Sequence, residues 1–214
     1  MTKPALIFWG GWEGHQPEAC AAVVADMLRA EGFDVVSNEG TDVLADADLT
    51  RFDLIVPLAT QVQVDRQALT NLVAAVEAGT GLGGFHGGMG DTFRNEPAYQ
   101  FMVGGQWVAH PGNIIDYRVE ITRPDDPLVA GIGDFHYRSE QYYLHVDPGI
   151  EVLATTTFSG EHAPWTKGVV MPVVWKHRYG AARVFYSALG HAAAEFEVPQ
   201  MREILRRGLL WAAR

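Results

Sequence analysis

The sequence predicts a single α/β domain in which a mostly parallel sheet is flanked by helices. Short apolar runs alternate with helical patterns through the first half of the chain, and right-handed crossovers of this kind place successive strands parallel. The chain has 214 residues, enough to cover both faces of a sheet. No repeat, low-complexity tract or linker divides it. We therefore expect residues 1–214 to form one domain.

Seven short apolar runs have the composition of buried parallel strands. They are Ala5–Trp9, Asp34–Ser37, Leu54–Leu58, Gly81–Phe85, Glu151–Ala154, Val173–Trp175 and Arg183–Ala188.

Three segments carry apolar residues at helical spacing. Pro17–Ala30 has proline in its first turn, where it is tolerated, and Asp65–Ala78 is followed by a glycine suited to a helix C-terminus. Pro199–Ala213 places Glu203 and Arg207 four residues apart on its solvent side, a weakly stabilising pair. The inward faces are expected to contain Cys20, Val23, Val24, Met27 and Leu28 in the first helix and Met201, Ile204, Leu205, Gly208 and Leu209 in the last.

The middle of the chain has a different pattern. Gly104–Thr157 is rich in Pro, Gly, Asp and aromatic residues and has no long helical periodicity, which predicts loops and extra strands. Trp175–Gly180 resembles a strand that ends in a tight hairpin, with Gly180 supplying a positive φ.

Charge and composition restrict the classes of molecule that the protein is expected to bind. The formal net charge is −10, without a run of five like charges, which argues against binding to nucleic acid or to anionic membranes. The first apolar stretch is too short for a signal-peptide core or a spanning helix, and one cysteine forms no internal disulfide. We expect a cytoplasmic protein with a small-molecule partner, and a homo-oligomer remains open.

Three histidines follow predicted strands directly. His15 comes after Ala5–Trp9 across a glycine-rich turn, His86 comes straight after Gly81–Phe85, and His191 follows the last strand through Leu189-Gly190. Ligands of open parallel sheets bind beyond the carboxyl ends of the strands. We therefore expect the three imidazoles at one edge of the sheet.

Gly84-Phe85-His86-Gly87-Gly88 has the frame of a nucleophile elbow with histidine in the position of the nucleophile. Glycines permit the sharp strand-to-helix turn, whose backbone N–H groups can bind an anion or a developing oxyanion, so Gly87 and Gly88 are candidate substrate-binding residues. The alternative is a glycine-rich turn whose histidine only bonds to the backbone. The segment is not a dinucleotide loop, because Gly81-x-Gly83 would need glycine at position 86, and NAD is not expected.

Blocks distributed in order over nearly the whole chain resemble the ThuA-like (trehalose-utilisation) family. The resemblance implies a flavodoxin-like fold of the class I glutamine-amidotransferase-like type and a role in carbohydrate metabolism, with keto-sugar derivatives of disaccharides as candidate substrates. It also points to His86, His110, Glu140 and His191 as site residues, with His15 in the first loop. The blocks are Gly84–Gly90, Gly104–Pro111, Ser139–Tyr143, Pro172–Trp175 and Tyr179–His191.

The residues themselves leave several roles open. His110 precedes a proline, which favours an extended loop, and Glu140 could orient an imidazole or act as an acid or base. Trp12, Trp107 and Tyr143, with neighbouring Tyr142, could stack on a sugar ring or belong to the core. The remaining histidines are expected to be structural or at the surface; they are His136, His145, His162 and His177.

Two chemistries suit this histidine cluster. The imidazoles could act directly as acid–base catalysts, or His86, His110 and His191 could bind a divalent metal such as zinc. The leading hypothesis is an enzyme that isomerises a sugar or keto-sugar or eliminates a group from it. The alternatives are a metal-dependent hydrolase and a non-enzymatic sugar-binding or regulatory protein. Glutamine amidotransfer is not expected, because Cys20, the single cysteine, falls on the apolar face of the first helix.

Overall fold

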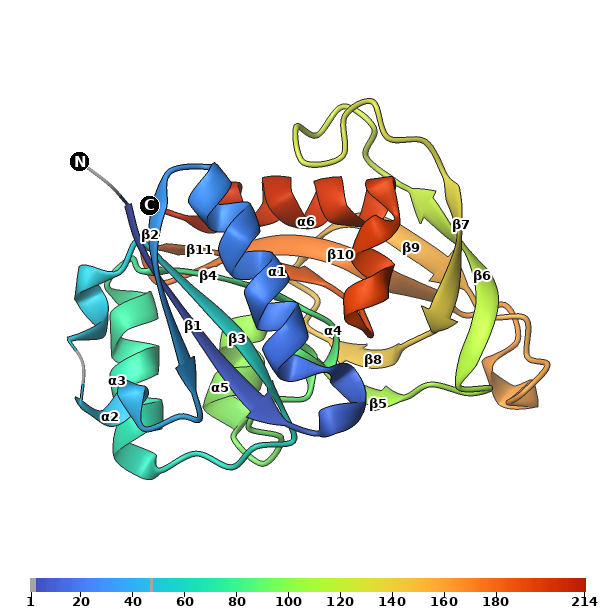
Figure 1. The fold of residues 1–214 in the computed structure, drawn as a ribbon. Helices are drawn as coiled ribbons and strands as arrows, with labels where there is room; N and C mark the ends of the chain where they lie inside the picture. Colours follow the sequence, from blue (N-terminus) through green and yellow to red (C-terminus); the bar gives the residue numbers. More distant parts are fainter. Residues whose placement is uncertain (1–2, 47) are drawn as a thin grey trace.

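The computed structural model describes residues 3–46 and 48–214 (Figure 1). Its helices and strands alternate through the first half of the chain, and strands dominate the second half. In chain order they are β1 (Lys3–Gly11), α1 (Pro17–Ala30), β2 (Phe33–Glu39), α2 (Val43–Asp46), β3 (Leu54–Thr60), α3 (Arg66–Glu77), β4 (Gly81–Phe85), α4 (His86–Gly90), α5 (Pro97–Val103), β5 (Gly105–Ala109), β6 (Ile114–Ile121), β7 (Phe135–Glu140), β8 (Tyr143–Val146), β9 (Glu151–Thr157), β10 (Val170–Tyr179), β11 (Ala182–Ser187) and α6 (Pro199–Ala212).

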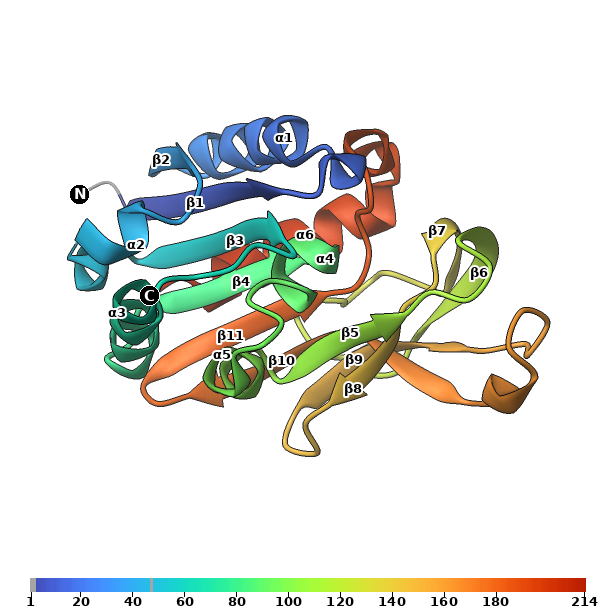
Figure 2. The same cartoon turned by 90° about the horizontal axis from the view of Figure 1, so that it is seen from below.

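A nine-stranded sheet forms the centre of the described part of the chain, in the order β2-β1-β3-β4-β11-β10-β9-β6-β7. Strands β2, β1, β3, β4 and β11 are parallel to one another and lie side by side in Figure 2. Their carboxyl ends therefore share one edge of the sheet, as the βαβ alternation predicted. The mixed α/β fold with a large parallel sheet and flanking helices is confirmed.

The expectation of parallel pairing was wrong for two of the seven strands. β10 pairs antiparallel with both β11 and β9. A two-residue turn at Gly180 and Ala181 joins β10 to β11, and a turn this short can only connect antiparallel strands. Gly180 has φ +56°, so the predicted hairpin and its glycine are confirmed.

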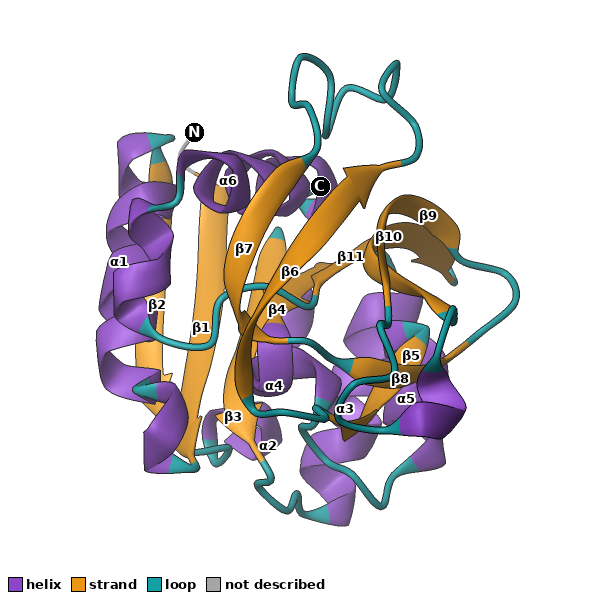
Figure 3. Cartoon of the chain, turned by 90° about the vertical axis from the view of Figure 1, so that its right-hand side faces the viewer, coloured by secondary structure: helices purple, strands orange, loops and turns teal. Residues whose placement is uncertain are grey.

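Helices cover both faces of the sheet (Figure 3). α1 and α6 pack on one face, where α1 contacts β1 and β2 and α6 contacts β4 and β11. α3 and α5 lie on the other face. The predicted inward residues of α6 are all buried, as are those of α1 except the half-buried Val23. No described helix is long and apolar enough to cross a membrane.

The predicted middle region of loops and extra strands contains β5 to β9. β6 and β7 form a long antiparallel pair that extends the sheet through β9, and in Figure 3 it lies in front of the other strands. β5 and β8 form a separate two-stranded sheet. The end of β7 and the segment that leads to β8 bring this region to the carboxyl edge of the parallel strands.

Candidate functional site: a histidine–carboxylate cluster

His86 occupies a strained turn between β4 and α4. Its φ is +46°, a conformation that costs free energy in residues other than glycine and that is found at functional sites. The neighbouring position must be glycine, because a Cβ on Gly87 would lie 2.5 Å from Cε1 of His15. The turn has the geometry that the elbow-like sequence predicted.

His15 and His191 reach the same place from the ends of two other parallel strands. His15 closes a 3₁₀ turn, Glu13–His15, just after β1, and His191 follows β11. The centre of the His15 ring lies 4.7 Å from that of His86 and 5.0 Å from that of His191. The three imidazoles that sequence reasoning placed at one edge of the sheet are therefore in mutual contact.

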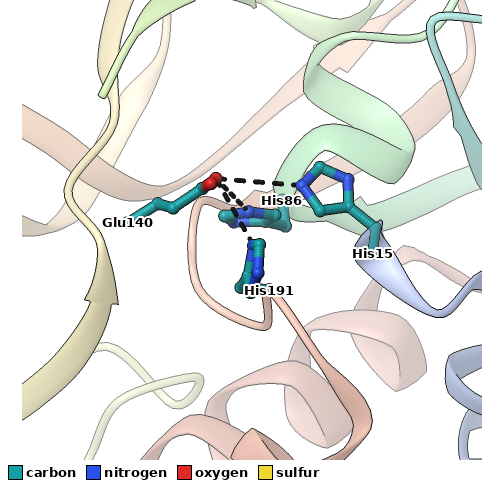
Figure 4. A group of neighbouring side chains, drawn as sticks. All are labelled: His15, His86, Glu140 and His191. Carbon is teal, nitrogen blue, oxygen red and sulfur yellow. Dashed lines mark hydrogen bonds and ion pairs between the residues drawn. The ribbon is translucent and has the colours of Figure 1, made fainter. Parts of the chain in front are cut away.

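Glu140, the last residue of β7, supplies the carboxylate at the centre of the cluster (Figure 4). Its Oε2 lies 3.1 Å from Nε2 of His86, 3.4 Å from Nδ1 of His191 and 3.8 Å from Nε2 of His15. The side chain is buried. A carboxylate without arginine or lysine nearby is thus held among three imidazole rings.

The hydrogen bonds of His86 define its tautomer. Nδ1 lies 2.8 Å from the carbonyl oxygen of Ala188, and because a carbonyl only accepts, Nδ1 must donate. Burial lowers the pKa of His86 to about 4, with partial compensation by the hydrogen bond that the protonated ring donates to Glu140. At neutral pH the ring is therefore uncharged, and its Nε2 lone pair faces a carboxylate oxygen.

The pKa values of His191 and Glu140 are shifted so that their charged forms are favoured. The hydrogen bond with Glu140 raises the pKa of His191. Burial would raise the pKa of Glu140, but favourable interactions with His15, His191 and His86 outweigh it and hold that pKa well below its usual range. Glu140 is therefore ionised at neutral pH, beside the uncharged ring of His86.

This donor set fits a divalent cation. Ligand atoms about 2.1 Å from a common ion lie about 3.0–3.4 Å apart. One such atom from each of His15, His86, Glu140 and His191 lies within 4.8 Å of the others, so the four side chains are grouped but would have to draw closer together around an ion. Nε2 of His15 and Nδ1 of His191 are buried and, among the described residues, have no partner other than Glu140 Oε2, at 3.8 Å and 3.4 Å. The opposite nitrogens of two rings have the supporting contacts typical of metal ligands, from His86 to Ala188 and from His15 to Thr60 Oγ1 at 2.8 Å.

His110 lies in the same cleft but outside the group of clustered ligand atoms. Its Nε2 lies 3.7 Å from Oε1 of Glu140, the carboxylate oxygen that does not face the other three imidazoles. The group therefore contains His86 and His191 of the expected metal set, together with His15 and Glu140, but not His110. The physical reason is that His110 follows β5, which belongs to the small separate sheet.

A cavity of about 200 Å³ opens beside the cluster. Of the predicted substrate-binding residues, Trp12 and Trp107 line it, whereas Tyr143 packs against Phe158 at a ring separation of 5.5 Å. Tyr142, which lines the cavity, stacks on His86 at 4.1 Å.

Gly87 and Gly88 do not line the cavity. Gly87 lies against the ring of His15 and the hydroxyl of Tyr142, and a Cβ on Gly88 would lie 3.0 Å from Cα of Leu58. Close packing therefore explains why both positions hold glycine.

Three cavity residues were missed in the sequence: Thr60, Gln61 and Asp91. Thr60 ends β3 and Gln61 follows it, so the rule that found the histidines, polar residues just past a strand, could have found both. Asp91 follows α4 and carries no comparable local signal. The remaining histidines, all outside the cluster, are His136, His145 and His162, which are exposed, and His177, whose Nε2 donates to the carbonyl of Met102.

Cys20 lies buried on α1 as expected, and its Sγ donates to the backbone carbonyl of His15 at 3.3 Å. Burial raises the pKa of the thiol to about 12. A protonated thiol that is bonded to the backbone is not a nucleophile, so Cys20 does not have the environment of a reactive cysteine.

The fold and the site together define an α/β protein of flavodoxin-like type with a histidine–carboxylate cluster at the carboxyl edge of its parallel strands. The family model of ThuA, described as trehalose utilisation, matches residues 4–212. The chain belongs to the ThuA family, which confirms the resemblance seen in its sequence blocks.

Solved structures with the same fold include two ThuA-like proteins. The one from Parabacteroides merdae is 19% identical with a TM-score of 0.78, over 99% of this chain and 90% of its own. The one from Bacteroides uniformis is 20% identical with a TM-score of 0.77, over 98% and 91%. A cytoplasmic protein from Salmonella typhimurium is 12% identical with a TM-score of 0.70, over 99% and 100%. No curated protein matches the chain significantly.

Proposed function

We propose that this chain is a divalent-metal-dependent enzyme of carbohydrate metabolism that moves a proton next to the carbonyl group of a keto-sugar, as in isomerisation or elimination. One observation carries the proposal: one ring nitrogen from each of His15, His86 and His191 and one carboxylate oxygen of Glu140 lie within 4.8 Å of one another. The carbohydrate class is supported by the description of the family, trehalose utilisation.

In this proposal the four clustered residues hold the cation. His15, His86 and His191 would each contribute one ring nitrogen, and Glu140 one oxygen. A bound divalent cation would polarise a carbonyl oxygen and stabilise negative charge that develops on it. The supporting hydrogen bonds from the opposite ring nitrogens of His15 and His86 keep both rings oriented.

His110 is the residue proposed to move the proton. It lines the cavity, lies outside the group that holds the cation, and has a buried Nδ1 without a hydrogen-bond partner. Imidazole exchanges protons readily near neutral pH. Its Nε2 contact with Glu140, at 3.7 Å, keeps the ring beside the cation site.

The first experiment measures metal. Protein purified without a histidine tag is analysed for bound metals, and we expect one equivalent of a transition metal such as zinc or manganese. His86→Ala should lose it, whereas His136→Ala, on the exposed side of β7, should retain it. Full activity in metal-free wild-type protein would refute the proposed metal dependence. Direct acid–base catalysis by the same histidines would then be the remaining mechanism.

The second experiment tests whether the protein transfers a proton on a keto-sugar. The metal-loaded protein is incubated in deuterated water with trehalose or its 3-keto form, and the products are followed by NMR. Deuterium incorporation next to the carbonyl, lost in His110→Ala with metal retained, supports proton transfer. Release of monosaccharides without such exchange would instead indicate hydrolysis, and binding without turnover a sugar-binding protein.

We further propose a cytoplasmic location. Its support is the single buried cysteine, which places no demand on an oxidising compartment, and the structural likeness to a cytoplasmic protein of Salmonella typhimurium. Fractionation of cells that express the protein from its native gene is the test, and recovery outside the cytoplasm would contradict it.

A further inference from the structure

A carboxylate that the cluster does not use faces the same cavity. Asp91 is 3% exposed and lines the cavity beside Trp107 and Gln61. Arg94 donates to its Oδ1 from Nε at 2.8 Å and from Nη2 at 2.6 Å. Both bonds go to one oxygen, so Arg94 leaves Oδ2 without a hydrogen bond from its guanidinium.

Arg94 also connects Asp91 to the aromatic wall. Its guanidinium lies 4.7 Å from the centre of the Trp107 ring, a cation–π contact. Because the cation is committed to Asp91 and to this ring, it offers little to an anionic ligand. Among the described residues that line the cavity there is no lysine or arginine, but there are two carboxylates, Asp91 and Glu140.

Two ring nitrogens in the same wall are unpaired. Nε1 of Trp107 and Nδ1 of His110 are buried and have no hydrogen-bond partner among the described residues. Buried polar groups are ordinarily bonded, and exceptions mark places where a ligand or water completes them. An indole N–H can only donate, so Trp107 requires an acceptor oxygen, which a ligand or a water molecule can supply.

We propose that Asp91 and Trp107 form a subsite that binds one neutral sugar ring beside the cation site and disfavours sugar acids and sugar phosphates. Asp91 accepts hydrogen bonds from ring hydroxyls, and the Trp107 indole donates one to a ring oxygen. This inference rests on the proposed function for the class of ligand, and it adds the residues that select within that class.

The size of the cavity limits the subsite to one ring. Its volume of about 200 Å³ is below the roughly 300–1,000 Å³ of pockets that enclose drug-sized ligands. Trp12, 49% exposed, borders the same cavity and offers an aromatic surface to a second ring outside it. A disaccharide would therefore place its terminal ring against Asp91.

Calorimetric titration of the metal-loaded protein with trehalose, glucose and glucuronate tests the proposal. We expect wild-type protein to bind the two neutral sugars and to bind glucuronate at least tenfold more weakly than glucose. Asp91→Asn should weaken glucose binding at least tenfold and reduce the discrimination against glucuronate. Trp107→Phe, which keeps the ring and removes the N–H, should weaken glucose binding about threefold or more. Asp116→Asn, an exposed carboxylate on β6, is the control.

Arg94 acts through Asp91, so its test needs a separate measurement. Arg94→Gln should reduce the preference for glucose over glucuronate, and Arg94→Lys should restore part of it, whereas a purely structural role would change both affinities equally. Circular dichroism and metal content confirm that each variant is folded and loaded.

The outcomes separate this inference from the proposed function. If wild-type protein without metal still discriminates glucose from glucuronate through Asp91, the proposed metal dependence is refuted and the proposed sugar subsite is supported. Asp91→Asn and Trp107→Phe proteins that bind glucose like wild type would overturn the subsite, as would failure of wild-type protein to bind trehalose and glucose.

Discussion

Replacement of Tyr137 by phenylalanine tests how the loop that carries His191 is held. The Tyr137 hydroxyl donates to Oε2 of Glu195 at 2.5 Å and accepts from the backbone N–H of Gly190 at 3.1 Å. The same Glu195 oxygen accepts from the backbone N–H of His191 at 2.9 Å. One buried hydroxyl thus connects β7 to the segment after β11.

The magnitude follows from the two bonds that are lost. A hydrogen bond to a charged group contributes about 1.5–3 kcal/mol, and a buried N–H left without an acceptor costs about 1–3 kcal/mol. Because the two hydrogen bonds share one hydroxyl and the surrounding structure is expected to relax partly, their free-energy contributions do not add fully. We expect Tyr137→Phe to lower the free energy of unfolding by about 2–4 kcal/mol, and Tm by roughly 5–15 °C in a chain of this size.

Urea unfolding of the metal-free protein, followed by circular dichroism, measures this loss, and metal titration measures the effect on His191. Tyr117→Phe is a matched control, since Tyr117 is also buried and its hydroxyl bonds a neutral carbonyl, that of Glu140, at 3.3 Å. It should cost about 1 kcal/mol. If Tyr137→Phe costs no more than the control, the Glu195 network does not hold the loop.

Three other expectations concern stability. Gly208→Ala should destabilise by about 1–3 kcal/mol in thermal unfolding, although alanine favours helix, because its Cβ would lie 2.2 Å from the buried Phe185 ring; an unchanged Tm would refute this. Cys20→Ala should cost about 1 kcal/mol and retain metal and activity, and lost activity in folded protein would revive a thiol mechanism. Hydrogen bonds from Arg206 lower the pKa of Glu203 from 4.5 to about 2, so its contribution, at most about 1 kcal/mol, is present above pH 4.5 and lost as pH falls toward 2. The difference in unfolding free energy between wild type and Glu203→Gln should shrink over that range, and a constant difference would contradict the assignment.

The parts of the site that were predictable depend on local signals. His86 was found because glycines around a strand end permit one sharp turn, and the structure has that turn with φ +46° at His86. His15 and His191 were found because residues just past parallel strands meet at one edge. Helix α1 begins and ends where expected, since proline in the first turn and an apolar face are local features.

Other features depended on pairing between distant segments. The antiparallel direction of β9 could not be recognised, because a buried apolar run has the same composition in either direction. For β10 the hairpin at Gly180 was the local signal. Tyr142 and Tyr143 are neighbours in sequence, and only packing decided that Tyr142 lines the cavity.

The amino-acid sequence by itself determined the α/β class and the family. It also identified His15, His86 and His191, three of the four clustered residues, because they directly follow predicted strands. The tertiary structure decided that Glu140 is the fourth member and that His110 stays outside the group. The register of β7 on β6, with Glu140 opposite Ile114, brings Glu140 onto His15, His86 and His191, while β5 and β8 pair in their own sheet and leave His110 at the rim. The physical reason is the difference between local and long-range structure. The carboxyl ends of successive parallel strands lie at one edge of the sheet, so residues that follow them can be identified from short sequence patterns. Glu140 lies more than 50 residues after His86, and its approach depends on long-range strand pairing that no short pattern encodes.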